Sequence, residues 1–241
     1  MKPDVRTTPT KKAPDRAARR RARRVLELLA AQQGPLAWKQ RYDPVSELVL
    51  TILSQHTSDV NAAKAYGRLR EAYGTWEEVM EAGPDGIGPH IQTAGLGRIK
   101  APRIVAALKR VVELRGELDP SFLSAMSLVE AKAWLRAIPG VGPKTAAIVL
   151  CFSFGMPAMA VDTHVFRVAR RLGLIGPKVT ADQAHDILEA LVSPADVYAF
   201  HVYLITHGRR VCRAQRPACG QCALAEGCPS RGLFLAAPSK A

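Results

Sequence analysis

Apolar residues recur at helical spacing along most of the chain, and no long stretch alternates apolar with polar residues as a strand would. Glycine, proline and capping residues separate these apolar segments. The longer predicted helices cover about residues 21–32, 45–53, 59–73, 100–114, 146–154, 163–172, 181–191 and 194–207. Shorter helices begin at the capping-box pairs Thr75/Glu78 and Ser127/Glu130. The pattern predicts an all-α protein of roughly ten helices.

A few segments lack this periodicity. Residues 1–20 are polar and basic, which is typical of a disordered tail. Residues 83–97 contain five glycines and two prolines and predict a loop-rich segment around a short helix. The polar stretch 54–59 interrupts two apolar segments, and we interpret 231–241 as a C-terminal tail.

The segment 138–164 holds the candidate chemistry. Pro139-Gly140-Val141-Gly142 predicts a tight turn, because glycine permits positive φ and lets a partner approach the backbone closely. Pro143 then suits the first position of a helix. The free N–H groups of the turn and of the new helix can bind a phosphate. We therefore expect a helix, a hairpin and a second helix, with Gly140, Val141 and Gly142 facing a nucleic-acid strand.

Lys144 lies in the first turn of the second helix, where the helix dipole opposes an ammonium. Beside apolar neighbours, its amine should lose a proton more readily than a surface lysine does. A neutral amine is a nucleophile that can form a Schiff base with a sugar carbon. Asp162 opens the next helix, and its carboxylate could stabilise positive charge on a sugar ring. An ordinary turn followed by a helix-capping aspartate is the alternative interpretation.

Four of the five cysteines lie close together near the C-terminus, in the spacing C-x6-C-x2-C-x5-C: Cys212, Cys219, Cys222 and Cys228. This spacing favours metal ligands over disulfides. Zinc sites usually show two close cysteine pairs and only one is present, so a 4Fe–4S cluster fits better. A zinc site with a solvated basic loop is the alternative. Cys151 lies within an apolar helix and is expected to be buried.

The net charge of +13 points to an anionic partner such as nucleic acid. Residues 1–24 contain ten Lys/Arg and two Asp, which gives +8 and leaves +5 for the remainder. Arg213 and Arg216 lie between the first two cysteines, on a loop that a bound metal would fix at both ends for contact with phosphate. No apolar run could span a bilayer and no signal peptide precedes the helices, so we expect a cytoplasmic protein, associated with the nucleoid if it is bacterial.

Three motifs together resemble the endonuclease III family of helix-hairpin-helix DNA glycosylases, over about residues 22–230. They are the hairpin 138–146, the segment Val161-Asp162-Thr163-His164 and the cysteine spacing. The resemblance implies two helical domains with double-stranded DNA bound in the cleft between them. One is a six-helix barrel, here about 37–156. The other, 21–36 with 157–230, carries the 4Fe–4S cluster.

The resemblance also implies a monomer that releases oxidised pyrimidines and nicks the strand at the abasic site by β-elimination, with Lys144 and Asp162 as the catalytic pair. In this family a Gln and a Leu fill the gap that a flipped nucleotide leaves. His56 stands at the Gln position with Gln55 before it, Leu96 matches the Leu, and Gly97 replaces a usual aromatic. Thr163 and His164 are expected near the DNA with the hairpin.

Other functions stay open at this point. A pyrimidine-dimer glycosylase can share all three motifs. An adenine-mismatch glycosylase of the same superfamily lacks the lysine and has a long extra C-terminal domain. A non-enzymatic DNA-binding or redox-sensing protein could keep the fold. An assay on duplexes with thymine glycol, an abasic site or a pyrimidine dimer would separate these functions.

Overall fold

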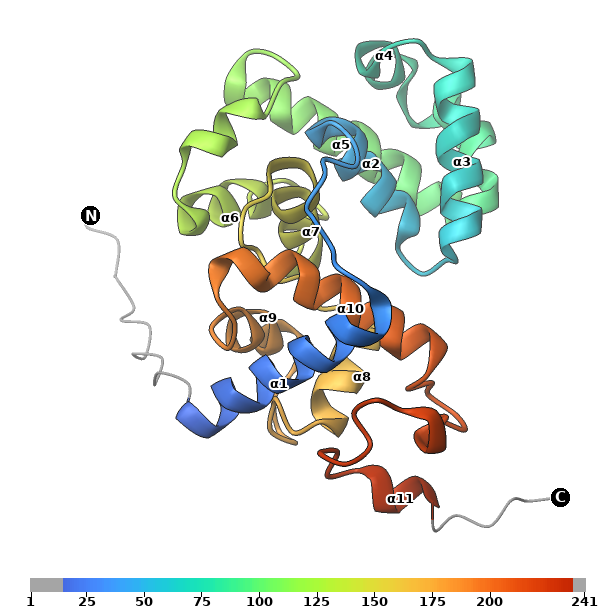
Figure 1. Cartoon of the computed structure of the whole chain (residues 1–241). Coiled ribbons are helices and arrows are strands. Elements are labelled where there is room, and N and C mark those ends of the chain that lie inside the picture. The colour runs from blue at the N-terminus through green and yellow to red at the C-terminus, as the bar shows by residue number, and fades with distance from the viewer. Residues whose placement is uncertain (1–14, 236–241) are drawn as a thin grey trace, which may run out of the picture.

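A computed structural model describes residues 15–235 and confirms the all-helical prediction, with no strand in that range (Figure 1). Its α-helices are α1 (Arg16–Gln33), α2 (Pro44–Ser54), α3 (Asp59–Ala72), α4 (Trp76–Ile87), α5 (Gly97–Arg115), α6 (Leu128–Arg136), α7 (Pro143–Phe154), α8 (Thr163–Arg171), α9 (Ala181–Glu189), α10 (Val197–Arg210) and α11 (Arg231–Leu235). The 3-10 helices are η1 (Gly88–Ala94), η2 (Ser121–Ala125), η3 (Pro194–Asp196) and η4 (Cys219–Gln221).

Local signals in the sequence set many of the helix ends. The capping boxes at Thr75 and Ser127 both form, with reciprocal side-chain and backbone hydrogen bonds. Pro143 begins α7, and Gly155 ends it with a φ of 66°. These ends were predictable because the residues that form each cap are neighbours in the chain.

Helix α1 begins at Arg16, so the prediction of disorder is wrong for residues 16–20. The buried residues Ala22, Val25 and Leu29 recur at helical spacing and fix the helix against its lobe, and the basic turns before them extend it. Residues 1–14 of the predicted tail lie outside the described residues. At the other end, residues 231–235 form α11, so the predicted tail is partly helical.

The prediction of a loop-rich segment at 83–97 is also wrong. Gly83, at a φ of 67°, breaks α4 at a sharp kink, and a second helical stretch continues to Ile87 and leads directly into η1. Ile87, Ile91 and Ala94 are fully buried, so core packing overrides the low helix propensity of the glycines. Helix α10 likewise runs on through Gly208 to Arg210, beyond the predicted end at residue 207.

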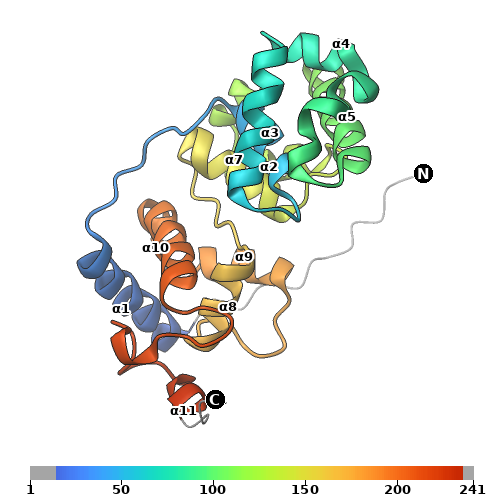
Figure 2. The same cartoon turned by 90° about the vertical axis from the view of Figure 1, so that its right-hand side faces the viewer.

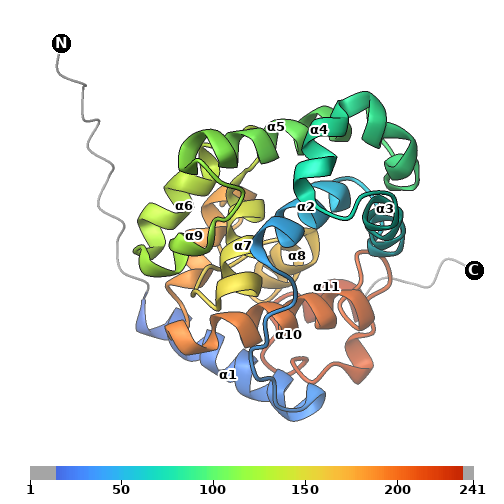
Figure 3. The same cartoon turned by 90° about the horizontal axis from the view of Figure 1, so that it is seen from above.

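The buried apolar side chains form two clusters, one in each of two lobes (Figures 1 and 2). Helices α2 to α7 surround the first cluster, with α2 and α7 near the centre when the lobe is seen from above (Figure 3). Helices α1, α8, α9 and α10 surround the second. The boundaries 37–156 and 157–230 stay a prediction, because a hydrophobic cluster does not by itself test independent folding.

Two segments cross between the lobes, residues 34–43 and residues 155–162 (Figure 2). In the second crossing Ala158 and Ala160 pack into the first cluster, while Met159 and Val161 pack into the second. Successive side chains of an extended segment point to opposite sides, which explains this alternation. The segment that leads to Asp162 is therefore fixed by both hydrophobic cores.

Candidate active site

The hairpin between α6 and α7 has the geometry that its sequence suggests. The amide of Val141 donates to the carbonyl of Ile138 at 3.1 Å and closes the turn. Gly140 has a φ of 79°, whereas Gly142 has extended backbone, so only one of the two glycines uses positive φ. Among the described residues, the amides of Gly140, Gly142 and Lys144 have no backbone acceptor, which leaves them available to a phosphate.

Lys144 is the second residue of α7. Its side chain is exposed, whereas the sequence suggested apolar surroundings for it. The following residues Thr145, Ala146 and Ala147 are buried and anchor the helix in the first lobe. The amine is thus presented to solvent beside the free hairpin amides, on a rigid base.

Asp162 is the N-cap of α8, and its Oδ1 accepts a hydrogen bond from the amide of Val165 at 2.7 Å. The segment before it is held by three side chains of the second lobe. His185 and His201 each bind a linker carbonyl at 2.8 Å through Nδ1, those of Met159 and Ala160. Glu189 accepts from the amide of Met159 at 3.0 Å and pairs with Lys132 of the first lobe.

Both Asp162 and Lys144 act electrostatically on His201. Burial lowers the pKa of this fully enclosed imidazole, and its hydrogen bond to Ala160 opposes that effect. The Asp162 carboxylate also raises the pKa, while the Lys144 ammonium lowers it. Both predicted catalytic side chains therefore lie within electrostatic range of this one residue.

An ion pair between the buried Glu47 and the partly exposed Arg41, beside this region, was not anticipated. Arg41 donates to Glu47 through both Nε, at 2.9 Å, and Nη2, and its guanidinium lies 4.6 Å from the ring centre of Phe152. Phe152 in turn packs edge-on against His201. One signal could have revealed the pair: Glu47 is a lone carboxylate in an otherwise apolar helix, and a buried carboxylate needs a partner.

The predicted gap-filling residues lie on two neighbouring turns of the first lobe. Gln55 follows α2 and accepts a hydrogen bond from Arg103 at 3.2 Å, while His56 is exposed. Leu96 precedes α5 and is 51 % exposed. The side chain of Arg103 also lies over Gly140, so it joins the first turn to the hairpin.

Three described residues other than glycine have positive φ: His56, Leu96 and Arg216. Each is among the residues assigned to DNA from the sequence. Left-handed backbone costs a non-glycine residue on the order of 1 kcal/mol and is more frequent at functional sites than elsewhere. Backbone strain therefore coincides with the predicted DNA contacts.

Thr163 and His164 follow Asp162 in the first turn of α8, and their environments differ. Thr163 is exposed. His164 is half-buried, contacts Arg167 through Nδ1 at 3.1 Å and packs against Gly208 of α10. The described contacts of His164 are thus with its own helix and with α10.

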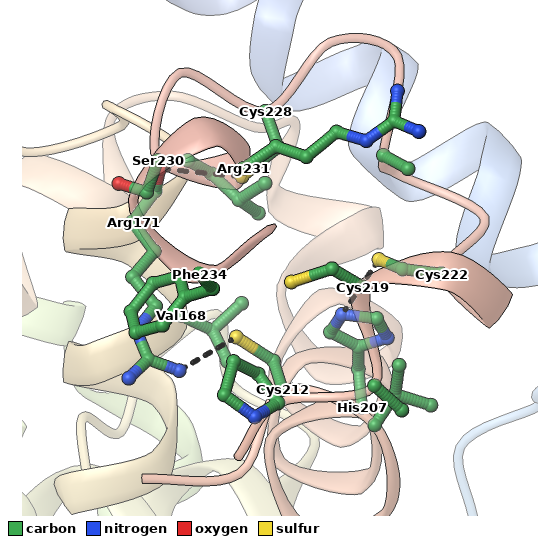
Figure 4. A pocket seen from close by; sticks show the side chains of 15 residues that line it. Val168, Arg171, His207, Cys212, Cys219, Cys222, Cys228, Ser230, Arg231 and Phe234 are labelled. Atoms are coloured by element: carbon green, nitrogen blue, oxygen red, sulfur yellow. Dashed lines mark hydrogen bonds between the residues drawn. The ribbon is translucent and has the colours of Figure 1, made fainter. Parts of the chain in front are cut away.

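The four C-terminal cysteines line one cavity and are all free thiols (Figure 4). Its empty space is about 410 Å³, counted out to its open mouth. Burial raises the pKa of the Cys222 and Cys228 thiols, and the other cysteines add to this effect. In the described part of the chain no three His, Cys, Asp or Glu side chains converge on a single metal ion.

Four cysteine thiols that line one cavity are the type of ligand set that holds an iron–sulfur cluster. Two cationic or donor side chains also face the thiols: Arg171 donates to Cys212 Sγ at 3.3 Å, and His207 Nε2 lies 3.6 Å from Cys222 Sγ. The donor set therefore fits an iron–sulfur cluster.

Arg171 also fixes the basic loop between the first two cysteines. Its guanidinium donates to the carbonyls of Arg213 and Ala214 at 2.7 and 2.9 Å. The same guanidinium lies over the ring of Phe234. The side chains of Arg213 and Arg216 are exposed. One guanidinium thus supports both the cavity and the loop that carries the two exposed arginines.

Comparison with known proteins agrees with this arrangement. Residues 49–194 match the family model described as HhH-GPD superfamily base excision DNA repair protein. Endonuclease III of Thermotoga maritima is 38 % identical over 77 % of this chain and 83 % of its own length. Endonuclease III of Escherichia coli K12 is 35 % identical over 77 % and 83 %.

Solved structures give the same result. A trapped endonuclease III–DNA covalent intermediate superimposes with a TM-score of 0.76 at 27 % identity, covering 90 % of this chain and 98 % of the other. A thermostable thymine-DNA glycosylase matches with a TM-score of 0.71 at 23 % identity, which supports the fold. The family model, the identities and the all-helical fold lead to one conclusion: the chain belongs to the endonuclease III family of base-excision DNA glycosylases and AP lyases.

Proposed function

We propose that this member of the family releases oxidised pyrimidines from double-stranded DNA and then nicks the strand, with Lys144 as the nucleophile. The observation that carries the proposal is the hairpin itself: within residues 15–235 the amides of Gly140 and Gly142 have no backbone acceptor, and the exposed side chain of Lys144 follows them in the first turn of α7. Asp162, at the start of α8 in the other lobe, supplies the carboxylate. The Lys144 amine and the Asp162 carboxylate then act on one sugar, while the free hairpin amides bind its phosphate.

The chemistry follows from these groups. Sugar C1′ is inaccessible in a duplex, so the damaged nucleotide is flipped out, and the amides of Gly140 and Gly142 hold a nearby phosphate. The Lys144 amine donates its electron pair to C1′, and the bond to the base breaks with its electrons leaving on the base. Asp162 stabilises the positive charge that develops on the sugar. The attacking amine loses a proton, which neutralises the departing base. The sugar ring then opens: the lysine nitrogen forms a double bond to C1′, the C1′–O4′ bond breaks, and O4′ takes up a proton. The Schiff base acidifies C2′, and loss of a C2′ proton expels the 3′ phosphate by β-elimination.

The cavity of Cys212, Cys219, Cys222 and Cys228 would hold a 4Fe–4S cluster. A bound cluster would link the C-terminal loop to the end of α10 and so stiffen the segment that carries Arg213 and Arg216, which we place on the DNA backbone. No step of base release depends on it.

Borohydride trapping tests the proposal, since it reduces the Schiff base to a stable amine between protein and DNA. Wild-type protein should be trapped on duplex that contains thymine glycol, and Lys144→Ala should not. Lys178→Ala, which removes another exposed lysine, is the matched control and should trap like the wild type. Equal trapping of Lys144→Ala would contradict the assignment of the nucleophile.

The alternative substrates are separated by the same assay on other duplexes. Base release from a pyrimidine dimer or from adenine opposite a damaged guanine, without release of thymine glycol, would favour the other glycosylase activities. Binding without any release would favour a non-enzymatic role. No described helix is long and apolar enough to cross a membrane. The cytoplasmic location and the monomeric state stay predictions.

A further inference from the structure

Lys100 has an unusual environment for a lysine. It lies in the first turn of α5 and is 1 % exposed, although its ammonium pairs with no carboxylate among the described residues. Its Nζ donates instead to two backbone carbonyls, that of Leu53 at 2.7 Å and that of Ala94 at 2.8 Å. Burial lowers the pKa of this amine, as expected where a charge is taken from water without an opposite charge.

The two carbonyls belong to two different helix ends. Leu53 is in the last turn of α2, and Ala94 is the final residue of η1. Unpaired carbonyls at a helix C-terminus carry partial negative charge, so an ammonium between two such ends is stabilised there. Lys100 therefore caps both helices at once and holds their ends at a fixed separation.

Each capped end leads directly into a turn assigned to DNA. His56 comes three residues after Leu53, and Leu96 comes two residues after Ala94. Both His56 and Leu96 have a φ of 53°, and both are exposed. The Lys100 amine thus binds the two carbonyls that immediately precede the two strained turns.

Burying the Lys100 ammonium has a desolvation cost that mere filling of the space would not require. A methionine of similar length would fill the space without the desolvation cost, but it could not bind either carbonyl. The ammonium supplies several donors on one atom, which lets it join two segments 41 residues apart in the chain. This geometry suits a role in which the spacing of the turns matters.

We infer that Lys100 is a positioning residue that fixes the spacing of the two turns, so that His56 and Leu96 enter the duplex together when a nucleotide is flipped out. Arg103, one turn further along α5, extends the arrangement by binding Gln55 and covering Gly140 of the hairpin. This inference rests on the proposed function, because it assumes that these side chains fill the gap in the duplex.

The test compares Schiff-base formation on an abasic site in paired duplex with that on the same site in single-stranded DNA. Single-stranded substrate needs no flipping, so a fault in the two turns should affect only the duplex. Lys100→Met should slow borohydride trapping on the duplex on the order of ten- to a hundredfold, and trapping on the single strand little. Leu108→Ala, a core change on the same helix, is the matched control and should leave the ratio of the two rates unchanged.

A double-mutant cycle then separates positioning from stability. If Lys100 acts through the second turn, Lys100→Met should change the duplex-to-single-strand ratio little once Leu96→Ala is present. An equal loss on both substrates, or full additivity with Leu96→Ala, would overturn the inference and leave Lys100 as a helix cap only. Should Lys100→Met not fold, Lys100→Gln, which can still bind one carbonyl, is subject to the same criteria. Failure of the proposed Schiff-base chemistry would look different, since the wild type would then be trapped on neither substrate.

Discussion

Two substitutions at Asp162 separate the structural role of this side chain from its proposed chemical role. The carboxylate caps α8 through a 2.7 Å hydrogen bond from Val165, and we also assign to it the stabilisation of a cationic sugar. Asparagine caps a helix about as well as aspartate but carries no charge, whereas alanine does neither. Asp162→Asn therefore removes only the charge, and Asp162→Ala removes both the charge and the cap.

The expected magnitudes differ accordingly. Loss of a cap costs about 1 kcal/mol, so Asp162→Ala should lower the thermal midpoint by about 2–4 °C for a chain of this size. Asp162→Asn should change the midpoint little. Both variants should release the base more slowly by a factor on the order of 10²–10³, the loss seen when one group that stabilises transition-state charge is removed.

Thermal unfolding and single-turnover release of thymine glycol measure the two effects independently. Base release by Asp162→Asn at the wild-type rate would refute the electrostatic role. A midpoint for Asp162→Asn as low as that for Asp162→Ala would refute the argument that the side-chain oxygen alone supplies the cap.

Three further predictions concern buried groups. Gly208→Ala should destabilise the fold by about 1–2 kcal/mol in urea unfolding, because the new Cβ would lie 2.9 Å from the Cβ of His164. A variant more stable than the wild type would show that α8 and α10 can move apart at no cost. Glu47→Gln should lower the free energy of unfolding by about 2–3 kcal/mol, since it leaves the partly exposed Arg41 without its anion. A loss of stability below about 1 kcal/mol would mean that water already screens the pair. Burial lowers the pKa of His185, whose neighbours are Asp182, Asp186 and Lys132, so the folded protein holds it neutral and the unfolded chain takes up the proton first as the pH falls. Stability should therefore decline below about pH 6.5, by at most about 1.4 kcal/mol per pH unit from this residue, and His185→Asn should flatten the decline.

The sequence could predict features whose parts are adjacent in the chain. The hairpin, the cap at Asp162 and the capping boxes depend on residues within four positions of one another. The same holds for the cysteine spacing, whose four thiols lie within 17 residues. Local chemistry decides such features before the chain folds.

The remaining features depend on segments that meet only in the folded chain. In the sequence Lys100 is indistinguishable from an exposed helix lysine, because its acceptors at Leu53 and Ala94 are brought together around it only by folding. The role of His201 likewise depends on the carbonyl of Ala160, which comes near it only in the folded protein. Residues 83–97 were misassigned for the same reason, because the glycines are visible in the sequence and the core that overrides them is not.

The strained turns have a consequence for protein engineering. Glycine at position 56, 96 or 216 would relax a left-handed backbone and recover about 1 kcal/mol at each, so these positions would attract a thermostabilising design. The same replacement would remove the side chain that we expect to meet the nucleic acid. Replacing these three residues by glycine would thus yield a more stable protein that binds DNA less well.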